Sequence, residues 1–79
     1  MERRSEPRQR TFLGASMARD RAPDVDCIVR NMSRAGACLE LQGPAVLPDE
    51  FSLLIRPAGV RRACRLVWRK AQRSGVRFL

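Results

Sequence analysis

Hydrophobic and polar residues alternate along most of the chain, in short runs separated by turn-forming residues. The alternating runs are Leu13–Met17, Val25–Val29, Ala37–Leu41, Phe51–Ile55, Cys64–Trp68 and Val76–Phe78. Successive side chains of a β-strand face opposite sides, so this pattern indicates strands with one buried face. The segments between the runs are rich in Gly, Pro, Asn, Asp and Ser, which favour turns. The pattern therefore predicts six short strands and little or no helix.

Six short strands in a chain of 79 residues raise the question of how the sheet ends. An open sheet of this size would leave two unpaired edges and one unburied face. Closing the sheet on itself removes both problems. We therefore predict an all-β fold, a small six-stranded antiparallel β-barrel. The residues expected in its interior are Val25, Cys27, Val29, Leu39, Leu41, Leu53, Ile55, Leu66, Trp68, Val76 and Phe78.

The N-terminus does not follow the strand pattern. The first ten residues, MERRSEPRQR, carry four arginines ahead of any residue that could enter a core. Pro7 biases Glu6 away from helix and toward an extended or turn conformation. We predict a flexible basic arm over residues 1–10, followed by the barrel over residues 11–79.

The composition points to an anionic partner and gives no basis for catalysis. The net charge is +8, and every basic residue except Lys70 is an arginine, a side chain suited to bidentate contacts with phosphate and guanine. The chain has no His, the commonest general base and metal ligand. Its carboxylates are scattered among loops, so no catalytic constellation can be assembled and we expect no enzyme. We also expect no metal and no cofactor.

The three cysteines and the short apolar runs indicate the cellular compartment in which the protein acts. Cys27, Cys38 and Cys64 are far apart and never form a CxxC pair, which argues against a zinc site and a disulfide framework. Cysteines in such positions typically act as small buried hydrophobic residues in a reducing cytoplasm. No run is long enough for a transmembrane helix, and the arginine-rich start does not resemble a signal peptide. We expect a cytoplasmic protein without membrane insertion.

Two short motifs carry candidate chemistry. Arg4 and Arg8 form an RxxxR pair, and about two dozen residues later NMSRAG begins at Asn31 and precedes a strand. Asn and Ser side chains can bind a ligand or brace the turn locally. Gly36 permits a positive φ or a close approach of the backbone to a ligand. Each motif alone occurs in many unrelated proteins, whereas the combination is specific.

Four stretches in this order resemble the PilZ domain family. They are RRSEPR, CIVRNMSRAGACLEL and the two ends of CRLVWRKAQRSGVRFL, where a strand ending in Trp-Arg turns into Gly-Val-Arg-Phe. The resemblance implies a six-stranded antiparallel barrel that binds cyclic di-GMP, a bacterial second messenger. It implies that the ligand is bound by Arg4, Arg8, Asn31, Ser33 and Gly36. Because ordering a flexible arm is coupled to binding, we further expect the arm to fold against the barrel with the ligand and to signal to a downstream partner protein that the sequence does not identify.

Two other functions stay open at the level of sequence. One is a basic nucleic-acid-binding barrel; single-strand binders present exposed aromatic residues, whereas Phe51, Trp68 and Phe78 here alternate in phase with core positions. The other is a PilZ-like adapter that binds protein and no nucleotide. Such members typically lose one of the two motifs, and this chain keeps both.

Overall fold

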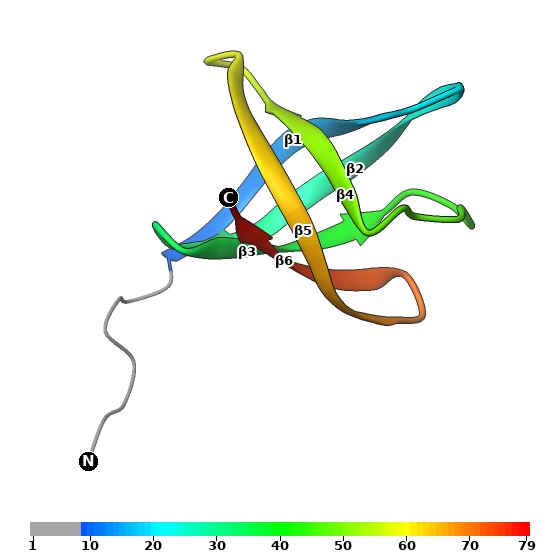
Figure 1. The fold of residues 1–79 in the computed structure, drawn as a ribbon. Helices are drawn as coiled ribbons and strands as arrows, with labels where there is room; N and C mark the ends of the chain where they lie inside the picture. The colour runs from blue at the N-terminus through cyan, green and yellow to red at the C-terminus, as the bar shows by residue number, and fades with distance from the viewer. Residues whose placement is uncertain (1–8) are drawn as a thin grey trace.

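The computed structural model describes residues 9–79, so Arg4, Arg8 and most of the predicted arm lie outside the described residues. Six strands follow one another along the chain (Figure 1). They are β1 (Gln9–Arg19), β2 (Ala22–Met32), β3 (Gly36–Leu41), β4 (Glu50–Ile55), β5 (Val60–Lys70) and β6 (Arg73–Phe78). Gln9 and Arg10, the last two residues of the predicted arm, are part of β1.

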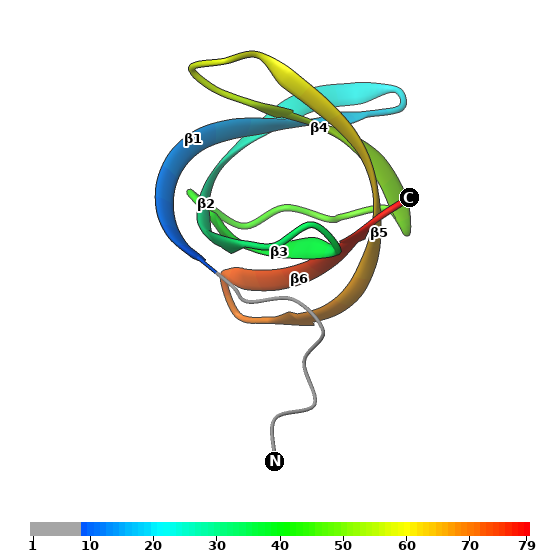
Figure 2. The ribbon, with the colours of Figure 1, turned by 90° about the vertical axis from the view of Figure 1, so that its left-hand side faces the viewer.

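The strands form one closed antiparallel barrel in the order β1-β2-β3-β6-β5-β4 (Figure 2). The strands β3 and β6 pair, and β4 closes the ring against β1, where Ala15 faces Ile55. The predicted all-β barrel is therefore confirmed. Residues 9–79 contain no helix long and apolar enough to cross a membrane.

The interior is filled by one face of every strand. Its buried hydrophobic residues are Ala15, Met17, Cys27, Val29, Ala37, Leu39, Leu41, Phe51, Leu53, Ile55, Cys64 and Val76. Of the residues predicted for the interior, Val25, Leu66 and Phe78 are only partly buried and pack against this core. The strand period alone thus identified most of the core, because an interior position recurs at every second residue.

The prediction that Trp68 lies in the interior is wrong. Its side chain is 46% exposed on the outer face of β5, and Val67 beside it is 62% exposed. The cause is a register irregularity between Leu66 and Trp68: Leu66 faces Val76, whereas Trp68 faces the very next residue, Gly75. A bulge of this kind adds one residue to a strand and reverses the facing of the side chains that follow it.

Strands β3 and β6 approach each other most closely at Gly36. A Cβ atom added at Gly36 would lie 2.1 Å from the carbonyl oxygen of Val76 and 3.2 Å from the Cα of Arg77. Both contacts are with backbone, which cannot rotate away as a side chain can. Only glycine therefore fits this position while β3 and β6 remain paired.

The three cysteines lie in two environments, and all are free thiols. Burial raises the pKa of the Cys27 thiol from 9.0 to about 12, with a further increase from the nearby Asp26 carboxylate. Burial likewise raises the pKa of Cys64 from 9.0 to about 11. Cys38, predicted to be buried, is instead half-buried, because it alternates with the buried Ala37 and Leu39.

The different environments predict selective thiol chemistry. Because the thiolate is the reactive form and burial raises the pKa of Cys27 and Cys64, we expect these two enclosed thiols to be unreactive at neutral pH, whereas reagent can reach the half-buried Cys38. Titration of the native protein with a thiol-reactive chromophore should release one equivalent rapidly, and all three thiols should react in denaturant. Cys38→Ala should abolish the rapid phase. A rapid phase of two or more equivalents in the native wild type would contradict the described burial.

The β3–β6 contact predicts a cost for Gly36→Ala. The added methyl group must push β6 away, so we expect the free energy of unfolding to fall by about 1–3 kcal/mol. Gly14→Ala is the matched control, because a Cβ at Gly14 meets no atom within 4 Å. Chemical denaturation of both variants measures the difference. Equal stability of Gly36→Ala and Gly14→Ala would show that β6 can yield at this point.

Candidate functional site

The second motif forms the connection between β2 and β3. The backbone N–H of Ser33 donates to the carbonyl of Gly36 at 2.9 Å. The Ser33 hydroxyl oxygen accepts from the N–H of Ala35 at 3.1 Å. The hydroxyl oxygen thereby braces its own turn, as Ser commonly does. Its proton is not used in this bond and can be donated to a ligand.

Asn31 lies near the end of β2, between the N-terminal strand and the next strand of the ring. It faces Arg10 of β1 on one side and Cys38 of β3 on the other. Gln9, the first described residue and the one that follows Arg8 in the chain, faces Met32. The end of the predicted arm therefore enters the barrel directly beside the second motif.

The turn of the second motif is also attached to the last strand. The N–H of Phe78 donates to the carbonyl of Ala35 at 2.8 Å, and Gly36 faces Arg77. Pairing of β3 with β6 thus places NMSRAG next to GVRF, although the two segments are far apart in the sequence.

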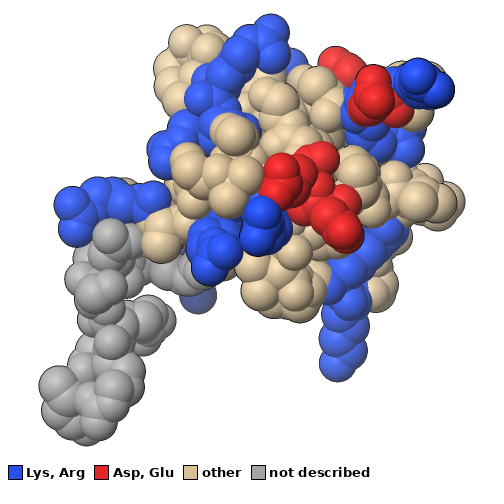
Figure 3. All heavy atoms as spheres, viewed as in Figure 1, with Lys and Arg blue, Asp and Glu red and all other residues tan. Residues whose placement is uncertain are grey.

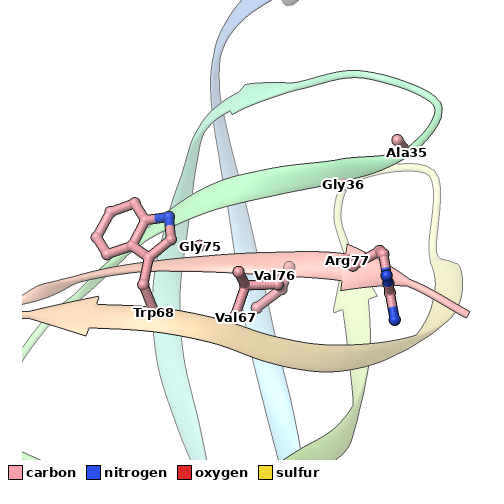
Figure 4. A pocket seen from close by; sticks show the side chains of 7 residues that line it. All are labelled: Ala35, Gly36, Val67, Trp68, Gly75, Val76 and Arg77. Carbon is pink, nitrogen blue, oxygen red and sulfur yellow. The ribbon is translucent and has the colours of Figure 1, made fainter.

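A surface cavity of about 230 Å³ lies where these segments meet (Figure 4). Residues from the end of the second motif and from β5 and β6 line it: Ala35, Gly36, Val67, Trp68, Gly75, Val76 and Arg77. Of the sequence-predicted ligand residues, Gly36 lines the cavity, Asn31 and Ser33 belong to the same β2–β3 segment, and Arg4 and Arg8 lie outside the described residues. The cavity therefore brings the second motif together with residues of β5 and β6 that belong to neither motif.

Trp68 is the principal residue that sequence reasoning missed at this site. Its indole lies on Gly75, so close that a Cβ added to Gly75 would be 2.1 Å from the indole Nε1. Figure 4 shows the ring standing at one end of the cavity beside Gly75. An exposed tryptophan with a free ring face can stack on a purine base. The bulge that turns it outward leaves no mark in the alternation of residues.

The charges next to the site are largely paired with one another. Arg30 donates to Glu40 at 2.9 Å and lies over the ring of Phe12, 4.9 Å from its centroid. The Nε of Arg73 is 3.9 Å from the same Glu40 carboxylate. Figure 3 shows that basic side chains spread over the visible face, with acidic ones gathered in a few patches among them. Part of the positive charge of the chain is thus held in ion pairs of the barrel itself.

Within residues 9–79, no three His, Cys, Asp or Glu side chains are grouped closely enough to hold a metal ion. The arrangement is suited to binding a ligand, because the cavity combines apolar side chains, an aromatic ring and the guanidinium group of Arg77, and the hydroxyl of Ser33 lies on the adjoining turn.

Comparison with known proteins agrees with this geometry. A search among curated proteins found no match for the chain. A family model described as the PilZ domain matches residues 2–79, almost the entire chain and both motifs. The chain therefore belongs to the PilZ domain family.

Proposed function

We propose that this domain is a receptor for cyclic di-GMP and not an enzyme. The observation that carries the proposal is the cavity, which the second-motif residue Gly36 borders on one side and the exposed Trp68 on the other. Membership of the PilZ domain family supports the same ligand. The three free cysteines support action in a reducing compartment, which we infer to be the cytoplasm.

The predicted ligand residues with polar side chains, together with Trp68, each have a chemically defined task in this proposal. Arg4 and Arg8 make bidentate contacts to guanine O6 and N7 or to a phosphate. Ser33 donates its free hydroxyl proton, Asn31 hydrogen-bonds a guanine edge or phosphate, and Trp68 stacks on a base. A micromolar complex needs about 8 kcal/mol. Two arginine contacts at about 1–3 kcal/mol each and stacking at about 1–3 kcal/mol cover a good part of it.

The signalling step in the proposal is ordering of the part of the N-terminal arm that precedes β1, residues 1–8. Binding folds the arm against the barrel beside β2, where β1 begins, and so creates a surface for a downstream protein. The entropy lost on ordering lowers the net affinity, as in other cases of coupled folding and binding.

Calorimetry on three chains tests the ligand and its residues. We expect wild type to bind cyclic di-GMP, Arg8→Ala to bind about ten- to a hundredfold more weakly, and Ser33→Ala about three- to tenfold more weakly. Ser52→Ala is the matched control for the serine, because Ser52 lies on β4 and faces Ala18 and Ala63. Absence of binding by wild type would favour a protein-binding adapter without a nucleotide ligand.

Trp68 also gives the nucleic-acid alternative an observation in its favour. Nucleic acid was disfavoured because the aromatic residues were expected in the core, and the exposed ring of Trp68 removes this argument. The net charge of +8 also suits a polyanionic ligand. The same calorimetric series therefore includes a random single-stranded oligonucleotide at several salt concentrations. Affinity for the oligonucleotide above that for cyclic di-GMP, with a steep dependence on salt, would identify a polymer binder.

Amide hydrogen exchange tests the ordering of the arm. Saturating cyclic di-GMP should slow exchange in residues 1–8, because amides that become packed or hydrogen-bonded exchange slowly. Strand β4 serves as the internal control and should not change, because it pairs with β1 only at Ala15–Ala18, beyond the segment that is proposed to become ordered. Unchanged exchange in residues 1–8 at saturation would contradict the proposed signal while leaving binding intact.

A further inference from the structure

Arg77 differs from the other arginines around the cavity because no group of the described residues neutralises it. It is exposed and lines the cavity, and its guanidinium group makes no hydrogen bond or ion pair with the side chains or backbone of residues 9–79. Its neighbours are engaged: Arg65 binds Glu50 through two guanidinium nitrogens, and Arg62 lies over the ring of Phe78. The one unengaged guanidinium at the cavity therefore comes from β6.

The position of Arg77 also carries an electrostatic cost. Arg77 of β6 directly faces Arg65 of β5, and like charges in directly opposed positions destabilise a sheet. Glu50 offsets the charge of Arg65 from the β4 side, whereas no carboxylate of residues 9–79 offsets the charge of Arg77, which is therefore a source of positive potential at its end of the cavity. A bound anion would relieve this repulsion.

The spacing along β6 suits a nucleotide. Trp68 covers Gly75, and Arg77 is two residues further along the same strand, about 7 Å away at the usual rise per residue. Figure 4 shows Trp68 and Arg77 at opposite ends of the cavity, with Val67 and Val76 between them. This separation resembles that between a purine ring and the phosphate of its own nucleotide.

We propose that Arg77 is a phosphate-binding residue of the site, supplied by the barrel and independent of the arm. It donates to a phosphodiester oxygen of the nucleotide whose base stacks on Trp68. Arginine suits the task because its guanidinium stays charged and presents several donors in one plane. This inference rests on the proposed function and adds a contact that lies in neither of the two motifs.

Substitution of Arg77 in the full chain tests this contact. We expect Arg77→Ala to weaken cyclic di-GMP binding about ten- to a hundredfold, as loss of a charged hydrogen bond does. Arg61→Ala is the matched control: Arg61 is exposed on β5, faces Leu54 of β4, and does not line the cavity. It removes the same charge and should change the affinity by less than about twofold. Thermal melts should show both variants folded.

Two smaller ligands separate a phosphate contact from a base contact. The chain has a single tryptophan, so one indole N–H signal in NMR reports binding at Trp68 even when affinity is weak. Arg77→Ala should weaken 5′-GMP but leave guanosine unchanged. Equal weakening of GMP and guanosine would overturn the phosphate assignment.

The outcomes distinguish this inference from the function on which it rests. If wild type does not bind cyclic di-GMP, the proposed function fails and the inference falls with it. If wild type binds and Arg77→Ala matches Arg61→Ala, the inference alone is wrong. In the Arg4→Ala/Arg8→Ala double variant, we expect residual GMP binding that a further Arg77→Ala removes. If the double variant and the triple variant bind GMP equally well, the inference is also overturned.

Discussion

The pairing of β3 with β6 is the constraint on which the site depends. These strands are not consecutive in the chain, yet Gly36–Glu40 and Arg73–Arg77 lie side by side and continue the barrel ring. The contact is tight enough at Gly36 that no side chain fits. It brings the second motif against the closing hairpin, so the cavity exists only because the ring closes in this register. Gly36 thus has a structural task apart from any task in binding.

The sequence predicted the fold well, and it predicted one side of the cavity, where Gly36 of the second motif lies. Alternation predicted the strands because each must present one apolar face to a common interior, and closure followed from the cost of free edges. Asn31, Ser33 and Gly36 could be found because they are close together in the chain. The far side of the cavity, with Trp68 and Arg77, could not, because it depends on strand register. The bulge before Trp68 was equally invisible, since Leu66 and Trp68 keep the spacing of two core residues.

The high net charge of the chain is weaker evidence for polyanion binding than its value of +8 suggests. A charge of +8 on 79 residues is what a binder of polyanions would show. In the barrel, however, Arg30 and Arg65 are paired with Glu40 and Glu50, and Arg19 donates to the backbone carbonyls of Pro23 and Val46. These guanidinium groups stabilise the surface of the fold. Arg77 is different, because Arg65 directly faces it and no carboxylate among residues 9–79 pairs with it.

A closed barrel also limits where a binding signal can arise. Every strand of the ring pairs on both sides, so a strand cannot shift without loss of backbone hydrogen bonds. The core is small and tightly filled, with Met17, Leu39 and Leu53 fully buried, and such packing resists continuous deformation. A ligand on the outer face can therefore alter the segments attached to the ring more readily than the ring itself. The turn at Ser33 and the start of β1 at Gln9 both adjoin the end of β2, which makes this end of the barrel the place where binding and response can be coupled.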